Sequence, residues 1–283
     1  EGCNSDSRSG SDVYTHHLTN VGGFCGIASG NVLITNCYSY GYGVGCEENA
    51  GGFCGSNSST ITDCFSTKDV GGQDSFGGFC GVNSGIIEDC YSTGDFAGIY
   101  GSNSSEEGGG FCGNNSGYIS GCYAEGDFKM NNIRLYSCIG GFCGINKGYI
   151  SYSYDNGYLN YGSLGLIEGG IYIDKMGGFC GFNDPSESDA IIEKCYSLNI
   201  LNFPVNISLN FYYSDYLIIH YIGAFCGLNG SFPAGAYTAT IRDCYSKGDM
   251  FGSCWNIADW NDPDYISCGL PPGEGFCRNQ GNN

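Results

Sequence analysis

The sequence is poor in positive charge: it has 10 Lys and Arg residues against 29 Asp and Glu, and its formal net charge is -19. Proteins that bind nucleic acid need a basic face, so this balance argues against a nucleic-acid partner. It is compatible with a solvated acidic surface or with weak binding of calcium, and the solvated surface is the simpler interpretation.

Histidine and long apolar runs are also scarce. The only histidines are His16, His17 and His220, and no Cys-x-x-Cys pair occurs, which argues against zinc; we expect no cofactor. The most apolar run, Tyr216 to Phe225, is too short to span a membrane. The sequence has no Ser/His/Asp arrangement, no phosphate-binding glycine loop and no cluster of carboxylates with basic partners. We therefore expect the chain not to be an enzyme.

What the sequence has in abundance is glycine and cysteine, with 50 and 19 residues respectively. So many thiols would be a liability in a reducing cytosol, which predicts a secreted or cell-surface protein. The first residues, Glu1-Gly2-Cys3, are typical of a start left by processing.

A Phe-Cys element recurs along the whole chain. It occurs eight times, with its cysteine at Cys25, Cys54, Cys80, Cys112, Cys143, Cys180, Cys226 and Cys277. The spacings are 29, 26, 32, 31, 37, 46 and 51 residues, so the later units carry insertions. We interpret residues 1–283 as a single repeat domain. Its repeats start near residues 21, 51, 77, 109, 140, 177 and 223, and a partial repeat covers residues 275–283.

Each unit has further fixed positions. An Asn, often followed by Gly, comes shortly after the Phe-Cys element, as in Asn83 and Gly85; both residue types tolerate positive φ, which predicts a tight turn there. An Ile stands three residues before a second cysteine, as in Ile87 and Cys90, and an aromatic residue follows at once. Residues three apart on a straight strand point to opposite faces, so we expect a corner between Ile87 and Cys90.

No segment shows an apolar period of 3.6 residues, while short β-prone runs between Gly, Asn and Asp clusters recur throughout. This predicts an all-β, β-helix-like solenoid of about seven to eight coils, each with two or three short strands. A β-propeller is the alternative, although units of 26 residues are short for a four-stranded blade.

The consensus Gly-Gly-Phe-Cys-Gly-x-Asn-x-Gly-x-Ile-x-x-Cys-Tyr-Ser-Thr-Gly resembles the GLUG motif of adhesin-like and other surface proteins. The resemblance covers Val21 to about Asp249 in seven copies, with a partial copy at the end. It implies a β-solenoid surface protein without catalytic residues. The family usually has an aliphatic pair where this chain has Phe-Cys, and the added cysteine implies that each coil carries its own disulfide.

The pairs within a coil would be Cys25–Cys37, Cys54–Cys64, Cys80–Cys90, Cys112–Cys122, Cys180–Cys195 and Cys226–Cys244. Cys138–Cys143 is a seventh candidate, because Ser153 replaces the second cysteine of that unit, and Cys254–Cys268 is an eighth. The alternative is a ladder of disulfides that links each coil to the next, and the sequence alone does not decide the connectivity.

Cys3, Cys46 and Cys277 remain, and an odd total suggests an intermolecular bond or a free thiol. The last residues resemble the front half of a unit, and residues 1–12 resemble the back half. We therefore expect head-to-tail stacking, in which residues 275–283 of one copy and residues 1–12 of the next complete a coil, with Cys3 and Cys277 as intermolecular candidates. The alternative is a Cys3–Cys46 pair in a fragment of a longer repeat protein.

Three further features of the sequence are candidates for surface sites. Five N-glycosylation sequons predict N-linked glycans at Asn57, Asn103, Asn114, Asn206 and Asn229. Trp255 and Trp260 form a candidate sugar-stacking platform, although local packing is the simpler account. Asp95, Asp127 and Asp249 recur with the repeat and could line up as a carboxylate row, which turn capping explains without a metal.

These observations lead to one functional expectation and one alternative. We expect a secreted, glycosylated structural protein that polymerises into an extracellular filament, with copies of itself as its main partner. The alternative is a cell-surface adhesin or carbohydrate-binding module on the same solenoid, which would bind extracellular polysaccharide.

Overall fold

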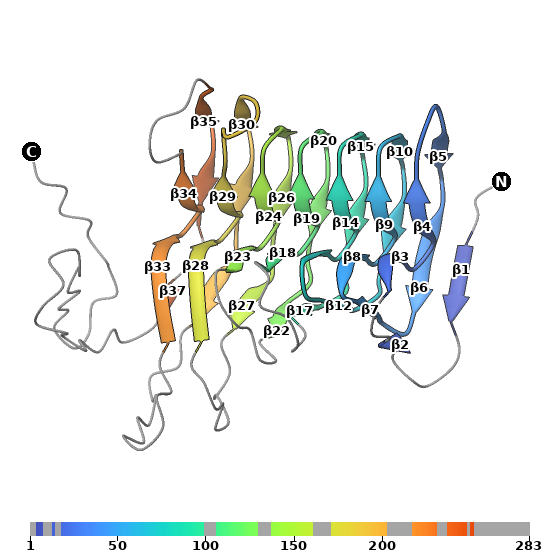
Figure 1. Cartoon of the computed structure of the whole chain (residues 1–283). Helices are drawn as coiled ribbons and strands as arrows, with labels where there is room; N and C mark the ends of the chain where they lie inside the picture. Colours follow the sequence, from blue (N-terminus) through green and yellow to red (C-terminus); the bar gives the residue numbers. More distant parts are fainter. Residues whose placement is uncertain are drawn as a thin grey trace, which may run out of the picture.

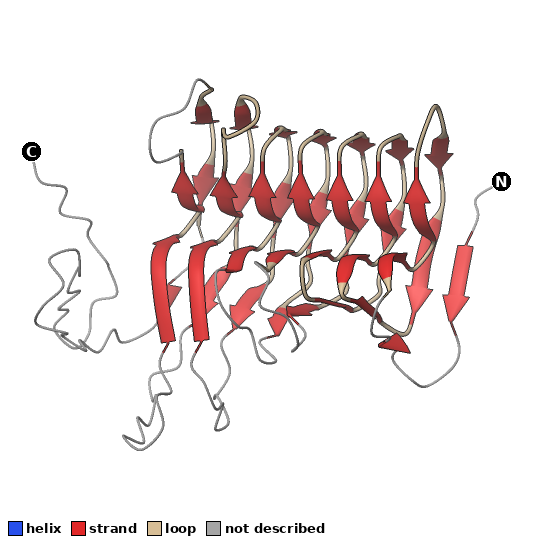
Figure 2. Ribbon diagram, viewed as in Figure 1, coloured by secondary structure: helices blue, strands red, loops and turns tan. Residues whose placement is uncertain are grey.

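The computed structural model of the chain describes residues 4–7, 13–14, 18–98, 106–129, 137–160, 171–202, 217–230, 237–247 and 250–251. The regular structure in these ranges is all β-strand, and the strands wind into stacked coils (Figures 1 and 2). Each full coil contributes one strand to each of five parallel sheets that run along the stack. The chain is therefore an all-β solenoid, as predicted. Sheets shared by every coil exclude a propeller, whose blades are separate sheets around a channel.

We number the sheets in the order in which a coil visits them, and the first three sheets have seven strands each. The first sheet consists of β3 (Thr19–Gly22), β8 (Glu48–Gly51), β13 (Ser75–Gly77), β18 (Glu107–Gly109), β23 (Ser137–Gly140), β28 (Ile171–Gly177) and β33 (Leu217–Gly223). The second consists of β4 (Cys25–Ala28), β9 (Cys54–Asn57), β14 (Cys80–Asn83), β19 (Cys112–Asn115), β24 (Cys143–Asn146), β29 (Cys180–Asn183) and β34 (Cys226–Asn229). The third consists of β5 (Leu33–Thr35), β10 (Thr60–Thr62), β15 (Ile86–Glu88), β20 (Tyr118–Ser120), β25 (Tyr149–Ser151), β30 (Ala190–Glu193) and β35 (Ala239–Arg242).

The fourth and fifth sheets have eight strands each. The fourth consists of β1 (Asn4–Ser7), β6 (Tyr38–Gly41), β11 (Phe65–Ser66), β16 (Tyr91–Ser92), β21 (Tyr123–Ala124), β26 (Tyr154–Asp155), β31 (Tyr196–Ser197) and β36 (Tyr245–Ser246). The fifth consists of β2 (Val13–Tyr14), β7 (Val44–Cys46), β12 (Val70–Gly72), β17 (Phe96–Gly98), β22 (Phe128–Lys129), β27 (Tyr158–Asn160), β32 (Ile200–Asn202) and β37 (Met250–Phe251).

The strands group into seven full coils and one half coil. Coil 1 is β3–β7, coil 2 is β8–β12, and so on to coil 7, which is β33–β37; β1 and β2 form a half coil on the outer side of coil 1. The expectation of two or three strands per coil was too low, because each Gly, Asn or Asp corner separates a strand of only two to seven residues. The predicted repeat starts are in register, as their aligned glycines show: Gly22, Gly51, Gly77, Gly109, Gly140, Gly177 and Gly223.

A left-handed residue makes the corner that precedes the second cysteine. In every coil this residue has a φ between 50° and 66°: Asn36, Asp63, Asp89, Gly121, Tyr152, Lys194 and Asp243. The corner rotates the chain between Ile87 and Cys90, so both side chains face the interior and both are completely buried. The predicted corner is confirmed.

The core is built of layers of identical side chains. The phenylalanines of the Phe-Cys elements stack face to face, with ring centroids 4.7 to 4.9 Å apart and planes within 7° of parallel: Phe24, Phe53, Phe79, Phe111, Phe142, Phe179 and Phe225. We call this column the phenylalanine ladder. It packs with the isoleucines and cysteines of the corner in one cluster. A second cluster, which includes Val70, Phe76 and Phe96, lies between the first and fifth sheets.

Glycine is required where neighbouring coils approach most closely. A Cβ at Gly78 would lie 2.2 Å from the carbonyl oxygen of Gly110 in the next coil, which no side chain tolerates. The Gly-Gly pair before the Phe-Cys element of coils 1 to 6 therefore permits the close coil spacing, and coil 7 has Ala224 in the second of these places. Most of the apolar run that begins at Tyr216 forms β33 of the first sheet.

Candidate functional site

A column of buried asparagines runs along the end of the second sheet. Asn57, Asn83, Asn115, Asn146 and Asn183 are completely buried and in register, and Asn229 continues the column in coil 7. The Nδ2 of each donates to the Oδ1 of the next at 2.7 to 2.8 Å. We call this column the asparagine ladder. An amide suits it because it is both donor and acceptor in one side chain.

The asparagine ladder corrects the reason given for the turn at this place. Asn83 and its equivalents end strands with ordinary φ, and in coils 2 to 6 no described residue of this turn has a positive φ; only in coils 1 and 7 does a glycine of the turn, Gly30 or Gly230, have one. The turn is made by side-chain capping: the Oδ1 of Asn83 accepts the Gly85 N–H at 3.2 Å, and Asn115 does the same for Gly117. This is the Asx-turn for which asparagine is favoured.

The cysteines form two columns along the stack. The first cysteine ladder comprises Cys25, Cys54, Cys80, Cys112, Cys143, Cys180 and Cys226, which are paired in register. The second comprises Cys37, Cys64, Cys90 and Cys122, then Ser153, then Cys195 and Cys244. In the second ladder the N–H of a cysteine donates to the Sγ of its equivalent in the next coil, as for Cys37 with Cys64 at 3.3 Å and Cys64 with Cys90 at 3.4 Å. Burial raises the pKa of the Cys80 and Cys143 thiols well above the ordinary value.

All fifteen cysteines in the described ranges are free thiols. The predicted disulfides within a coil are thus not formed in this structure, and the ladder cysteines are aligned with their equivalents in the neighbouring coils. This arrangement favours the alternative connectivity between coils. Cys138, predicted to pair with Cys143, lies in the first sheet, and Cys46 is buried in the second cluster. Cys3, Cys254, Cys268 and Cys277 lie outside the described residues.

The sequons divide by accessibility. Asn57 is a member of the asparagine ladder and its Nδ2 already donates to Asn83, so the folded coil has no space for a glycan at this amide. Asn114 lies on the outer face, half-buried, and donates to Glu107 at 2.8 Å. Asn229 is exposed at the end of its ladder. Asn103 and Asn206 lie outside the described residues.

A second aromatic column lies on the outer face of the fourth sheet. It comprises Tyr38, Phe65, Tyr91, Tyr123, Tyr154, Tyr196 and Tyr245, with centroids 4.8 to 5.2 Å apart. Burial, with the neighbouring rings Tyr91 and Tyr154, raises the pKa of Tyr123 to about 12. Each inner ring has both of its faces covered by neighbours, so this outer aromatic ladder presents ring edges to the solvent. The Trp255 and Trp260 platform lies outside the described residues.

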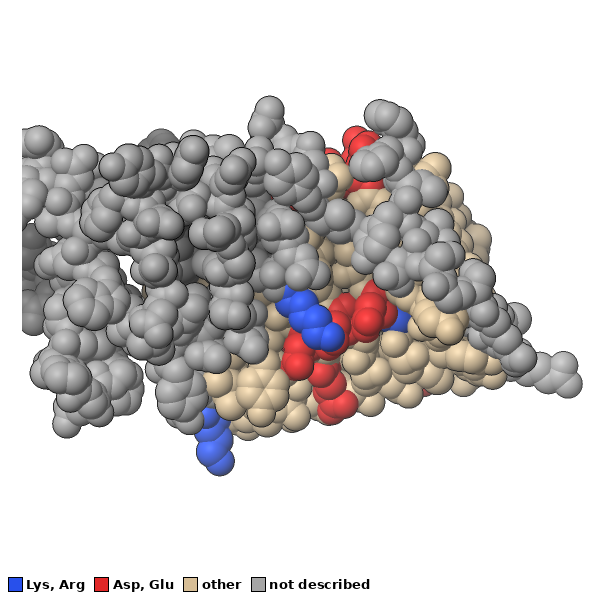
Figure 3. Space-filling view, turned by 90° about the horizontal axis from the view of Figure 1, so that it is seen from below, with Lys and Arg blue, Asp and Glu red and all other residues tan. Residues whose placement is uncertain are grey.

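The predicted carboxylate row exists and caps the coils. Asp69 accepts the N–H of Asp95 at 2.9 Å, Asp95 accepts that of Asp127 at 2.9 Å, and Asp127 accepts that of Tyr158 at 2.9 Å. Lys129 forms an ion pair with Asp95, and this hydrogen bond raises the pKa of Lys129. Figure 3, a view from below, shows acidic and basic side chains gathered on one face. Capping thus accounts for the row as expected; Asp249 lies outside the described residues.

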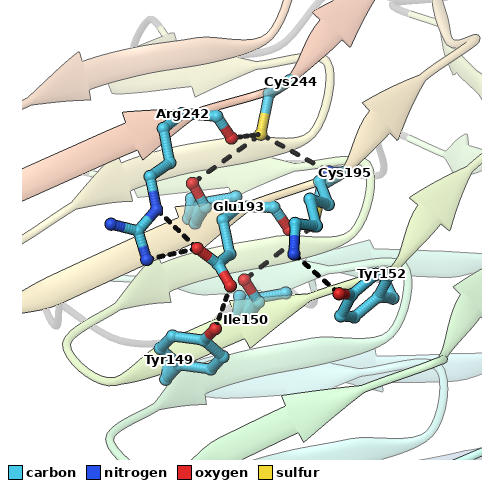
Figure 4. A network of polar contacts seen from close by, with 9 residues as sticks. Tyr149, Ile150, Tyr152, Glu193, Cys195, Arg242 and Cys244 are labelled. Carbon is cyan, nitrogen blue, oxygen red and sulfur yellow. Dashed lines mark hydrogen bonds and ion pairs between the residues drawn. The ribbon is translucent and has the colours of Figure 1, made fainter.

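A polar network joins the third sheet of coils 5, 6 and 7 (Figure 4). Glu193 accepts hydrogen bonds from Tyr149 in coil 5 and Arg242 in coil 7, and these two contacts lower the pKa of Glu193. Lys194 donates to the hydroxyl of Tyr152 at 2.7 Å. The network ties the last coils together on the outer face, and sequence reasoning missed it because its members come from three repeats.

Asp155 is the one buried carboxyl in the serine column of the fourth sheet. It is 1% exposed and in register with Ala124 and Ser197; Ser197 donates to its Oδ2 at 3.0 Å, and its Oδ1 has no partner. Burial raises the pKa of Asp155 well above its ordinary value. The folded chain thus keeps this proton at a pH where the unfolded chain has lost it.

This difference predicts that Asp155→Ser stabilises the chain at neutral pH. Between about pH 4 and the pKa of Asp155 in the folded chain, the contribution of Asp155 makes the free energy of unfolding fall as pH rises. The total fall is about 1.4 kcal/mol for each unit by which the pKa of the folded chain exceeds that of the unfolded chain. Urea unfolding at pH 4.5 and pH 7 measures the effect, with the exposed Glu125→Gln as control. If the free energy of unfolding fell by the same amount between pH 4.5 and pH 7 in the wild type and in Asp155→Ser, the carboxyl would not be buried.

Two searches for other kinds of site give results for the described ranges only. In them, no group of three or more His, Cys, Asp and Glu side chains is placed to hold a metal ion. The same residues contain no helix long and apolar enough to cross a membrane.

Comparison with known proteins gives one match. Residues 72–97, which run from the end of β12 to β17 and so cover coil 3, match the family described as the GLUG motif. The resemblance inferred from the repeat consensus is confirmed for this unit, and the other coils repeat its strands and its first cysteine in register. No curated protein and no solved structure matches the chain significantly.

Proposed function

We propose that this GLUG-motif solenoid is a secreted structural protein that assembles head to tail into an extracellular filament. The observation that carries the proposal is the stepped, open end of the stack. β1 and β2 add an eighth layer to the fourth and fifth sheets, while the first three sheets end at β3, β4 and β5.

The step leaves strand edges for another copy to use. In the described ranges no strand pairs with the outer side of β3, β4 or β5. An open edge of this kind carries backbone donors and acceptors that recruit further strands. If a second copy supplied one strand in each of these three positions, these strands would form a complete coil together with β1 and β2.

The side chains at the two ends of the described stack are also complementary. Phe24, Cys25 and Ile34 of coil 1 are only partly buried, as are their equivalents in coil 7, Phe225, Cys226 and Ile241. The corresponding residues of coils 2 to 6 are completely buried. A second copy stacked in register would continue all three columns. Such a contact joins different surfaces of the two copies and does not close, so it produces a filament.

The extracellular, glycosylated character of the filament rests on the sequence. The chain has 19 cysteines, and of its sequons Asn114 and Asn229 lie on the outer surface. A glycan at Asn114 would project from the side of the stack and leave its ends free to pair, whereas Asn229 ends the asparagine ladder on the face that a stacked copy would cover, so the filament requires Asn229 to be unglycosylated.

A charge at the open end tests the proposal. Leu33 is 63% exposed in β5, the end strand of the third sheet, and Ile86 occupies the same register position inside the stack with 41% exposure. Leu33→Glu should raise the concentration needed for assembly by about threefold or more, because stacking would lower the exposure of this side chain toward the 41% of Ile86 and would take the carboxylate partly out of water. Ile86→Glu should assemble like the wild type.

Negative-stain electron microscopy and sedimentation velocity measure this difference. Filaments of the wild type and Ile86→Glu, with short or single particles of Leu33→Glu, are expected. Identical assembly of all three chains, or single particles of the wild type, would contradict head-to-tail stacking at this end.

The alternative of an adhesin or carbohydrate-binding module stays a prediction. Sugar rings stack on the open faces of aromatic side chains, whereas the inner rings of the outer aromatic ladder cover one another's faces. Glycan-array binding that is lost on Trp255→Ala or Trp260→Ala would favour the alternative.

A further inference from the structure

Ser153 interrupts the second cysteine ladder and separates Cys195 and Cys244 from the other cysteines of that ladder. Cys122 donates its N–H to the Oγ of Ser153 at 3.2 Å, where the other coils offer a thiol. On the far side of Ser153 the described ladder continues with only Cys195 in coil 6 and Cys244 in coil 7. Within its ladder, Cys195 thus has one thiol neighbour in the described part of the chain.

The two cysteines lie side by side across adjacent coils (Figure 4). Glu193 pairs with Arg242 before them and Tyr196 with Tyr245 after them, so Cys195 and Cys244 are in register. The backbone nitrogen of Cys195 donates to the Sγ of Cys244 at 3.4 Å, and each thiol donates to the carbonyl oxygen two residues before it. Neighbouring strands are about 4.8 Å apart, which lies within the Cα separation of about 4.4–6.8 Å that disulfides adopt.

The environments of the two thiols differ in a way that suits exchange chemistry. Cys195 is 1% exposed, whereas Cys244 is only partly buried. The hydrogen bond from Cys195 lowers the pKa of the Cys244 thiol to about 7. Cys244 is therefore the accessible thiolate, and Cys195 lies behind it as the resolving thiol.

We propose that Cys195 and Cys244 close a disulfide between coils 6 and 7 by exchange with an oxidised low-molecular-weight thiol of the glutathione disulfide class. The Cys244 thiolate attacks one sulfur of the small disulfide, which forms a mixed disulfide and releases one small thiolate. The Cys195 sulfur, after losing its proton, then attacks the Cys244 sulfur and releases the second small thiolate. The two protein thiols are oxidised by two electrons, and one small disulfide is reduced to two thiols.

The Cys195–Cys244 disulfide would link coil 7, at the end of the described stack, to coil 6. Coil 7 has coil 6 on one side, and its core residues Phe225 and Ile241 are only partly buried. End units of a stacked array open more readily than inner units. With the disulfide closed, coil 7 opens only together with coil 6.

The test incubates the whole chain with glutathione disulfide and reads it by mass spectrometry of non-reduced proteolytic peptides. The wild type should give a peptide that joins Cys195 to Cys244. Cys195→Ser should keep one glutathione on Cys244, and Cys244→Ser should leave Cys195 unmodified. Ser153→Cys should lower the yield of the joined peptide, because the new thiol competes for Cys195.

Amide hydrogen exchange of β35 and β36 provides a second readout and should slow by about tenfold or more on oxidation. Pairing of Cys195 with Cys180 or of Cys244 with Cys226 would overturn the proposal. Two unreacted thiols after oxidation would overturn it as well. A monomeric wild type would contradict the filament but would leave this pair unaffected, so the two proposals fail separately.

Discussion

Replacing Phe111 with alanine should lower the free energy of unfolding by about 3–5 kcal/mol, because a completely buried aromatic ring leaves a cavity that the coil cannot close. Phe111 lies between Phe79 and Phe142, with both centroids 4.9 Å away. Its loss therefore interrupts the phenylalanine ladder in the middle of the stack and removes contacts from two neighbouring coils.

The matched control is Tyr123→Ala in the same coil. Tyr123 stacks equally closely on two rings, at 4.8 and 5.0 Å, but lies half-buried on the outer face. Its loss should cost about 1–2 kcal/mol. Urea unfolding gives the totals, and hydrogen exchange of coils 3 to 5 locates the damage, because a repeat array does not have to unfold in one step. Equal losses for the two variants would show that stacking, not burial, holds the coils.

Asn115→Leu should be comparably damaging although leucine is similar in size and more apolar. The substitution removes the acceptor for Asn83, the donor for Asn146 and the acceptor for the Gly117 N–H. Each buried polar group left without a partner costs about 1–3 kcal/mol, so we expect a loss of about 3–5 kcal/mol. The measurement is again urea unfolding.

Asn114→Leu is the control, because it makes the same change one residue earlier. Asn114 points to the outer face and donates only to Glu107 in the described structure. Its replacement should change stability by less than about 1 kcal/mol. A loss for Asn115→Leu as small as this would mean that the amides of the asparagine ladder are not paired.

Position within the repeat was enough to predict the core. Phe79, Ile87 and Cys90 recur at fixed places, and a solenoid puts equivalent residues of every coil on top of one another. The corner followed from the odd spacing of Ile87 and Cys90. Its left-handed residue, Asp89, carried a readable signal as well, since Asn, Asp or Gly occupies this place in five of the seven coils.

The asparagine ladder was missed because asparagine has a sufficient local explanation as a turn residue. The available signal was the strictness of the position: a turn would accept Gly or Asp, whereas six successive coils keep Asn. The amide of Asn donates to the next layer with its nitrogen and accepts from the previous layer with its oxygen, whereas Gly has no side chain and an ionised Asp has no donor. The sequon at Asn57 was misleading for the same reason, since the motif does not record that its amide is buried.

Cysteine connectivity lay beyond the sequence for a different reason. Cys80 and Cys90 are close along the chain, while Cys80 and Cys112 are close only because their strands are in register. Whether Cys80 lies nearer to Cys90 or to Cys112 depends on the number of strands in a coil, and too few strands were predicted from the sequence. The polar network around Glu193 could not be found either, because it joins Tyr149 of coil 5, Glu193 of coil 6 and Arg242 of coil 7, which are far apart in the sequence.

The most direct test of the account is cryo-electron microscopy of the concentrated wild-type chain. Seven full coils and one coil shared between copies make eight layers per subunit in every sheet. At about 4.8 Å per layer, the account predicts a continuous solenoid with an axial rise of about 38 Å per subunit. Single stacks that do not lengthen with concentration, or filaments in which stacks pack side by side with their ends unpaired, would contradict it.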